Sequence, residues 1–539
     1  MKDLKAISQN SRIFRKHSAI TMLGALMSVV MLAGCGNSAN EPTATSTSSS
    51  SASEPIHILL SHSEFAYAKQ AKEDDIYKKE LNRLSGFNVK YDFLGHSDYA
   101  QQLSLRFASG DLADLIRTDS IVSTIHSGAV DQGVFLELGP LIDKYAPTLK
   151  KKIPEEFWKS PRISKDGKIY GIPVTRGVPA DRSIFIRQDW LDKLKMDAPK
   201  TLEEYLAFFE AVKKEDMNGN GDPNDEYGLG MFNNIIWTDI FTPAFGVHTN
   251  KWSLKNGQLT PDIIDPRMKE AIAFYKQLYD KGYINPNLFV KKEDEQNASI
   301  AKGEVGVWGA AVYQYLAGYG KDNAQKTFLN QPGASVSMIA PPQGPRGDKG
   351  MALQSDEIYF VWVIPAKAKN PENIIKYLEW AYSSPEADQF FAYGIKGQNY
   401  TEENGQIKYD INQPVNVEKN AFQMYQVSLN PREIGFAAPL VLKALPESDK
   451  ITKGYATSKE SLIPNEAKYM PRLESLASHP ELNIGAAQGT LFLDMFAKVL
   501  TGREPLDSAF DNFVAEWKKR GGDAAIKEAT EWYNKFNSK

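Results

Sequence analysis

Pro55-Ile-His-Ile-Leu-Leu60 is the stretch that decides the fold class of this chain. It is a short apolar run that follows a leader without large apolar side chains, which is typical of a buried strand. A polar stretch with helical character follows at residues 68–84, and Phe87-Asn-Val-Lys-Tyr-Asp-Phe93 is the next strand pattern. Strand, helix and strand in this order predict a parallel pair. We therefore expect an α/β lobe that begins at residue 55.

The same alternation continues along the chain. A helix pattern at residues 99–108 leads into a third strand pattern at 112–117, and a later strand at 359–365 is expected to return to this lobe. A strand passing into a helix at residues 185–191 begins a second α/β unit. Thr201, with Glu204 three residues later, predicts a capping box at the start of a helix that runs to Lys214. The last third is largely helical by pattern.

The length of the chain predicts more than one hydrophobic core. It has 539 residues, 42% of them hydrophobic, and single cores stop growing near about 250 to 300 residues. We expect a first lobe from residues 55–178 plus about 357–430, and a second lobe from about 179–356 plus 431–539. Two α/β lobes are the expected architecture.

Residues 1–34 have the pattern of a lipoprotein signal peptide. A basic start precedes a mostly apolar run at residues 19–33, which is too short to span a bilayer comfortably. Leu32-Ala33-Gly34-Cys35 resembles the lipobox of bacterial lipoproteins, in which the signal is cut before the cysteine and its thiol is acylated. Cys35 is the only cysteine in the chain. We expect Cys35 to be lipidated, and an ordinary secretory signal is the alternative.

Residues 35–54 predict a disordered tether. They are rich in serine and threonine and lack any large apolar group that could seed a core. Residues 1–35 carry five basic groups and one acid, so the rest of the chain has a formal charge of −8. A mildly acidic body argues against nucleic acid as a partner.

One loop has the composition of a cation site. Its oxygen-bearing side chains are Asp216, Asn218, Asn220, Asp222, Asp225 and Glu226. Oxygens recur at every second position and Gly221 permits the turn, as in the first half of an EF-hand loop, although Tyr227 stands at the twelfth position. Hard oxygen ligands without nearby His or Cys favour calcium, with Asp222 giving its carbonyl. A structural calcium ion is expected here, and a solvated Asx-turn loop is the alternative.

Aromatic side chains stack on sugar faces, and several lie near the expected loops. The candidates for ligand contact are Trp237, Trp252, Trp308, Tyr313 and Trp362, with Arg176, Asp181 and Glu357 as possible polar partners. Trp308 is the strongest candidate because it ends a strand between glycines. Each of these tryptophans has a core residue as its alternative interpretation.

Enzyme signatures are weak throughout. The sequence has no nucleophile elbow, phosphate-binding glycine loop, dinucleotide fingerprint or histidine pair at zinc spacing. The many acids include no local pattern that selects a glycosidase pair. No catalytic residue is assigned.

Four segments spread along the body resemble one family. They are residues 103–115, 167–173, 186–194 with Pro199-Lys200-Thr201, and 500–503 with Trp517. This set resembles the extracellular solute-binding proteins of bacterial ABC transporters, family 1, in the large oligosaccharide-type lipoprotein subgroup of Gram-positive bacteria. One departure is Ala113, where many relatives have proline.

The resemblance implies a type II periplasmic-binding-protein-like fold, with two α/β lobes, a hinge and an interlobe cleft. It implies a non-enzymatic, monomeric receptor that is lipid-anchored at the outer face of the cell membrane. Such a receptor captures an oligosaccharide, an acidic or plant-wall fragment among the options, and delivers it to ABC permease subunits. A peptide-binding receptor is the first alternative, and a lipid-anchored glycoside hydrolase is the second.

Overall fold

The computed structural model divides the chain into two units, residues 1–52 and 53–539. The structure describes residues 54–62, 75–95, 98–175, 182–233, 235–312, 333–410, 413–417, 425–428, 448–483 and 490–537. All of these belong to the second unit, which holds two separate hydrophobic cores. The predicted signal peptide, the tether and Cys35 lie outside the described residues.

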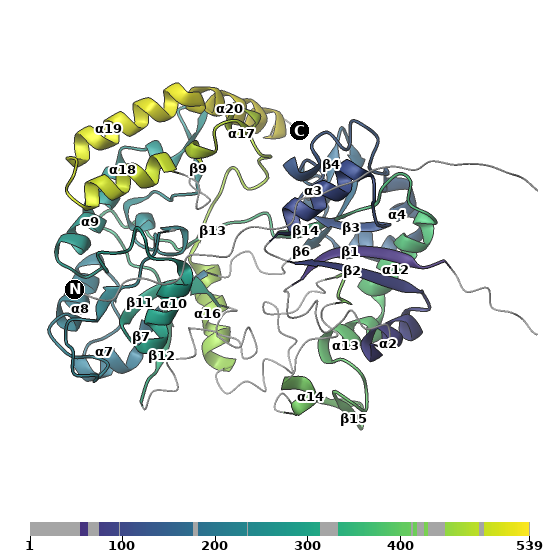
Figure 1. Ribbon diagram of the computed structural model, residues 1–539, viewed down its shortest axis with the longest axis horizontal. Coiled ribbons are helices and arrows are strands. Elements are labelled where there is room, and N and C mark those ends of the chain that lie inside the picture. Colours follow the sequence, from purple (N-terminus) through teal and green to yellow (C-terminus); the bar gives the residue numbers. More distant parts are fainter. Residues whose placement is uncertain are drawn as a thin grey trace, which may run out of the picture. The chain divides into compact units, whose positions relative to one another are not determined.

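A five-stranded sheet forms the centre of the first lobe, in the order β2-β1-β3-β14-β6. These strands are β1 (Ile56–His62), β2 (Val89–Gly95), β3 (Leu115–Thr118), β6 (Gly171–Thr175) and β14 (Ile358–Val363). The predicted parallel pairing of β1 and β2 is confirmed, and β3 pairs with β1 in the same sense. The late strand β14 lies antiparallel between β3 and β6, as expected of a strand that returns from far along the chain (Figure 1).

Helices pack around this sheet and complete the first core. They are α2 (Ile76–Ser85), α3 (Tyr99–Ser109), α4 (Gly139–Tyr145), α5 (Pro147–Lys152), α6 (Glu155–Trp158), α12 (Pro371–Ser383) and α13 (Pro385–Tyr393). The buried core draws on residues between Ile56 and Val174 and between Ile358 and Val427. Asn370 precedes α12 with a left-handed backbone, φ 50°, and its side chain makes no capping hydrogen bond.

A four-stranded sheet, in the order β12-β7-β11-β8, forms the centre of the second lobe. These strands are β7 (Arg182–Arg187), β8 (Tyr227–Leu229), β11 (Val305–Ala311) and β12 (Val336–Ile339). β7 runs antiparallel to both β11 and β12, whereas β11 pairs with β8 in parallel. A separate hairpin joins β9 (Trp252–Lys255) to β10 (Gln258–Pro261).

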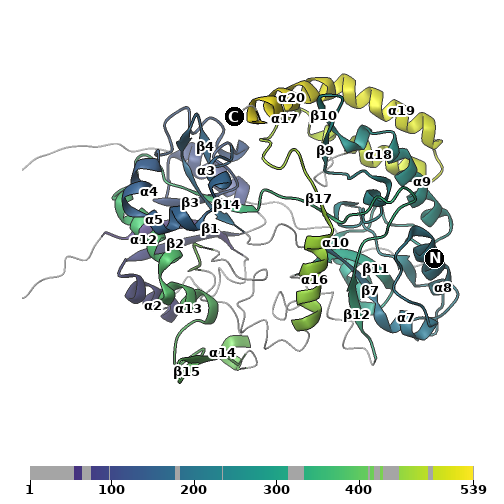
Figure 2. The ribbon, with the colours of Figure 1, turned by 180° about the vertical axis from the view of Figure 1, so that it is seen from behind.

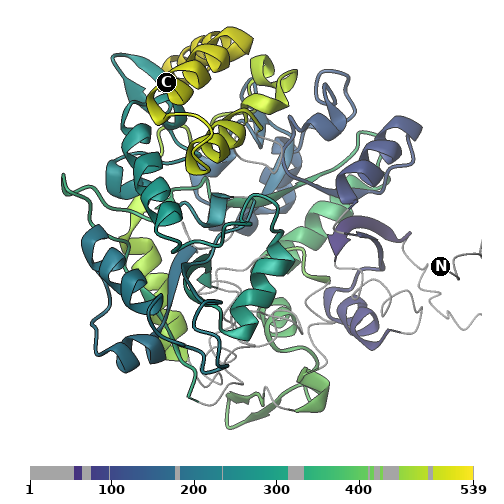
Figure 3. The same ribbon diagram turned by 60° about the vertical axis from the view of Figure 1, so that its left-hand side comes forward.

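The second core combines central elements with the C-terminal helices. They are α7 (Gln188–Leu194), α8 (Leu202–Val212), α9 (Arg267–Asp280), α10 (Glu293–Lys302), α18 (Thr490–Leu500), α19 (Leu506–Trp517) and α20 (Asp523–Asn537). The capping box of Thr201 and Glu204 is confirmed at the start of α8. α18 packs on α9 and α20 packs on β10, so the yellow end of the chain covers teal elements in Figures 1, 2 and 3.

Smaller elements connect these parts. They include α14 (Pro414–Val417), α16 (Ser448–Glu460), α17 (Glu474–Ala477), the strands β4 (Ser164–Lys165) and β5 (Lys168–Ile169), and the strands β13 (Ala352–Leu353) and β17 (Leu462–Ile463). A tight turn joins β4 to β5, with Asp166 and Gly167 both at positive φ. Within the described residues, no helix is long and apolar enough to cross a membrane.

Candidate functional site

A pocket in the second lobe is framed by α10, the end of β11 and the short helix η2 (Ile235–Trp237). Its lining residues are Gly230, Phe232, Trp237, Thr238, Glu293, Gln296, Asn297, Ile300, Trp308, Gly309 and Ala310. The hollow measures about 620 Å³, including the space open to solvent at its mouth. We name it the α10 pocket.

Two of the predicted ligand-contacting tryptophans, Trp308 and Trp237, lie in this pocket. Trp308 is almost completely buried and stacks on Phe185 of the neighbouring strand, with ring centroids 5.7 Å apart and planes 8° apart. Trp237 is half-buried. Gly309 allows them to approach, because a Cβ there would lie 1.9 Å from the Trp237 carbonyl oxygen. Their contact with a ligand stays a prediction.

Gln296 supplies a polar group that the sequence interpretation missed. Its side chain is 4% exposed, and neither Nε2 nor Oε1 has a hydrogen-bond partner. Gly230 leaves room for the carboxamide in this position, since a Cβ there would lie 2.0 Å from Nε2 of Gln296. A buried amide without partners costs about 1–3 kcal/mol of stability, so this group is poised to bond to something that enters the pocket.

A buried ion pair lies beside Trp237. Arg182, at the start of β7, pairs with Asp239, and both side chains are at most 9% exposed. Asp239 also accepts a hydrogen bond from the Thr249 hydroxyl. The Arg182 guanidinium lies 5.8 Å from the centre of the Trp237 ring. The Arg182–Asp239 pair therefore packs beside the Trp237 ring and holds it in place.

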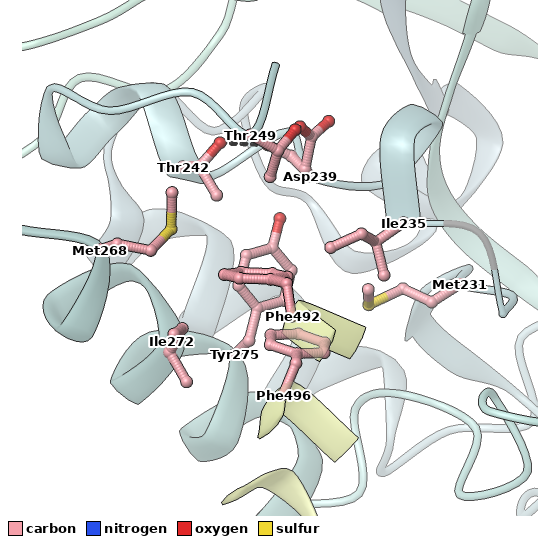
Figure 4. Close-up of a pocket in the computed structure, with 10 residues that line it drawn as sticks. All are labelled: Met231, Ile235, Asp239, Thr242, Thr249, Met268, Ile272, Tyr275, Phe492 and Phe496. Carbon is pink, nitrogen blue, oxygen red and sulfur yellow. Dashed lines mark hydrogen bonds between the residues drawn. The ribbon is translucent and has the colours of Figure 1, made fainter. Parts of the chain in front are cut away.

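Asp239 also borders a second, smaller cavity. Most of its walls are apolar, from Met231, Ile235, Met268, Ile272, Phe492 and Phe496. Asp239, Thr242, Thr249 and the Tyr275 hydroxyl gather at its polar end, as Figure 4 shows. The Tyr275 hydroxyl is already bonded to the Thr238 carbonyl at 2.9 Å. The cavity therefore belongs to the packing behind the α10 pocket.

Two other predicted tryptophans are not among the residues that line the α10 pocket. Trp362 is fully buried in β14, and its ring N–H donates to the Val427 carbonyl at 2.7 Å. Trp252 packs against Trp517 on the second core, with ring centroids 6.4 Å apart. Trp362 is corrected from a ligand contact to a core residue, because its ring is buried in the first core. Trp252 is half-buried at the margin of the second core, and its contact with a ligand stays a prediction.

Glu357 lies immediately before β14, in a left-handed backbone conformation with φ 57°. Burial raises the pKa of its carboxyl above the ordinary value, and the charge of Lys468 opposes that rise. Glu357 is not among the residues that line the α10 pocket. The predicted contacts Arg176, Asp181 and Tyr313 lie outside the described residues.

The predicted cation loop folds as a chain of side-chain-to-backbone turns. Asp216 accepts hydrogen bonds from the N–H groups of Gly219, Asn220 and Gly221 at 2.7–3.2 Å. Its pKa is lowered by these bonds, with the N–H of Gly221 first. The side chains of Asn218, Asn220 and Asp222 each accept from the N–H two residues on. Gly219 and Gly221 have positive φ, which glycine tolerates.

Two acids converge at the end of this loop. Glu226 is 4% exposed, and its Oε1 accepts from the N–H groups of Met217 and Asn218 at 2.7 and 3.0 Å. Its Oε2 and the Oδ1 of Asp225 are buried without a hydrogen-bond partner. Burial raises the pKa of Glu226, and the charge of Asp225 adds to the rise. No three His, Cys, Asp or Glu side chains cluster for a metal among the described residues, so amides and carbonyls would complete any ligand set.

The sequence pattern of bacterial extracellular solute-binding proteins matches residues 61–388. This match covers more than half of the chain and includes strands of both sheets. The chain belongs to this family. Members of this family bind solutes outside the cytoplasm and are not enzymes.

This solute-binding protein is similar to named relatives over nearly its whole length. It is 26% identical to lipoprotein LipO of Bacillus subtilis, over 94% of this chain and 97% of LipO. It is 25% identical to the polygalacturonan/rhamnogalacturonan-binding protein YtcQ of the same species, over 93% of this chain and 95% of YtcQ.

A solved structure shares the fold of this solute-binding protein. It is the EF-hand mutant of FusA, an ABC-transporter substrate-binding protein of S. pneumoniae, in complex with fructo-nystose. The TM-score is 0.64 at 20% identity, and the match covers 90% of this chain and all of the FusA chain. The α/β, two-lobe fold class expected from the sequence is confirmed.

Proposed function

We propose that this chain is the oligosaccharide receptor of an ABC importer. The observation that carries the proposal is the α10 pocket, where a half-buried tryptophan and an unpartnered carboxamide meet in a chain of the solute-binding family. Flat aromatic faces and bifunctional amides are the groups that recognise sugar rings and their hydroxyls. The sugar ligands in the names of YtcQ and the FusA complex support the same class of ligand.

We also propose that Cys35 carries the lipid anchor of this receptor. The sole cysteine lies at the end of a lipobox-like stretch, and LipO, which aligns with most of the chain, is named a lipoprotein. An anchored receptor at the outer face of the membrane, acting as a monomer, delivers its ligand to the permease subunits of the importer. The serine-rich residues 36–54 give it reach from the membrane surface.

We propose calcium as the structural ion of the loop at residues 216–226. The two unpartnered carboxylate oxygens of Asp225 and Glu226 fit a hard cation, and the remaining oxygens come from amides and carbonyls. FusA, which was solved as an EF-hand mutant, supports a loop of this kind in a similar fold. The ion would neutralise two adjacent buried charges and hold the loop between α8 and β8.

Thermal unfolding of the full chain in detergent, with panels of oligosaccharides and peptides, tests the proposed function. A ligand that binds only the folded state adds about 2.7 kcal/mol at one hundred times its Kd, which raises the melting midpoint by several degrees. We expect at least one oligosaccharide to raise the midpoint and the peptides to leave it unchanged. A shift with peptides alone would make the chain a peptide receptor and refute the proposal.

A further inference from the structure

We propose that the α10 pocket is a subsite for one uncharged sugar ring, and that the Gln296 carboxamide determines this specificity by bonding to adjacent hydroxyls of the ring. The inference rests on the proposed function and adds to it the chemical class of the ring. Its central observation is the juxtaposition of a buried, unpartnered carboxamide with a half-buried tryptophan in one hollow.

The hydrogen-bonding capacity of Gln296 fits a pair of hydroxyls. Its Oε1 accepts and its Nε2 donates two hydrogen bonds, and each sugar hydroxyl both donates and accepts. Nε2 lies close to Gly230, where a Cβ would come within 2.0 Å of it. Asn297, the next residue on α10, is half-buried in the same lining and offers a second carboxamide.

The charges of the described lining favour a neutral ring over an acidic one. No Lys, Arg or His lines the described part of the pocket, and its only charged lining residue is the exposed Glu293. Arg182, the cation beside the Trp237 ring, is already paired with Asp239. A sugar carboxylate placed here would lose its hydration without gaining a counter-charge. A neutral ring carries no such cost.

The test is a tryptophan-fluorescence titration of the full chain in detergent, before and after Gln296→Met. The probes are neutral trisaccharides of glucose, galactose, mannose and fructose, and trigalacturonic acid. Methionine has a similar length but no hydrogen-bonding amide. We expect the best neutral trisaccharide to lose about tenfold or more in affinity, since two hydrogen bonds disappear. The melting midpoint of the ligand-free variant should stay the same or rise, because an unpartnered buried amide is gone.

Two further variants complete the test. The first is a control for the exchange of glutamine for methionine, and the second removes the donor at position 296. Gln277→Met makes the same exchange at an exposed position of α9 and should leave both affinity and midpoint unchanged. Gln296→Glu keeps the side-chain shape but removes the donor and adds a charge, so it should also weaken neutral trisaccharides.

The outcomes separate this inference from the proposed function. A neutral trisaccharide that binds Gln296→Met and the unaltered chain equally would overturn the subsite and leave the receptor function intact. Binding of trigalacturonic acid that is lost in Gln296→Met would overturn the neutral specificity. Peptide binding without any saccharide binding would overturn the proposed function itself.

Discussion

Asp239 is a single carboxylate on which several groups of the second lobe depend. It pairs with Arg182, accepts from the Thr249 hydroxyl, and its main-chain carbonyl accepts from the Thr242 hydroxyl at 2.9 Å. Through Arg182 it also stabilises the position of the Trp237 ring. One residue thus links the packing behind the α10 pocket to the aromatic face inside it.

Asp239→Asn should strongly destabilise the fold. The exchange keeps the shape but leaves the Arg182 guanidinium buried without a counter-charge, and breaking a buried pair in this way costs about 3–5 kcal/mol. Chemical denaturation would measure the free energy of unfolding. Glu270→Gln is the matched control, because it breaks the exposed Glu270–Arg346 pair in the same lobe, for which about 0–1 kcal/mol is expected. Equal losses in the two variants would show that Asp239 is not a structural anchor.

At the scale of elements, the loop between α8 and β8 is a preformed turn in which Asp225 and Glu226 each keep one carboxylate oxygen without a hydrogen-bond partner. Its backbone is already held by the side chains of Asp216 and Asn218. The unpartnered oxygens of Asp225 and Glu226 are therefore the part of the loop that a cation would change most.

Glu226→Gln should weaken or abolish the calcium response of the chain. Calcium should raise the melting midpoint of the unaltered chain, because it neutralises two buried carboxylates. Without calcium, the Glu226→Gln variant should melt at the same temperature as the unaltered chain or higher, since one buried charge is gone and the N–H groups of Met217 and Asn218 still find an acceptor. Thermal unfolding with and without a chelator measures both effects. An undiminished calcium shift in the variant would exclude Glu226 as a ligand.

Local sequence patterns predicted the elements better than they predicted which side chains are accessible. The β1–β2 pair, the α8 capping box and the return of β14 were evident because each depends on periodicity or on one capping residue. Trp362 and Trp308 both lie in apolar strand segments, and each strand is next to the edge of its sheet. Only the elements that pack around each ring distinguish a core side chain from one that borders a pocket. Gln296 has exposed acidic neighbours on α10, and its burial beside Gly230 arises from tertiary packing that the local sequence does not indicate.

At the scale of the whole molecule, the chain builds two cores from non-contiguous segments. The first core uses residues from 56–174 and 358–427. The second core uses residues from 184–351 together with the C-terminal helices. Length and composition predicted two lobes, because a chain of 539 residues exceeds what one core can hold. The ligand could not be inferred from composition, because ligand recognition depends on a few polar groups in one pocket and only the fold brings them together.

The central claim is that this molecule captures an oligosaccharide and releases it unaltered. The most direct measurement is equilibrium dialysis of the full chain against the saccharide that raises its melting midpoint, followed by mass spectrometry of the saccharide that is released on unfolding. The account predicts one saccharide per chain with its mass unchanged. Shorter saccharide fragments, or no bound saccharide at all, would contradict it.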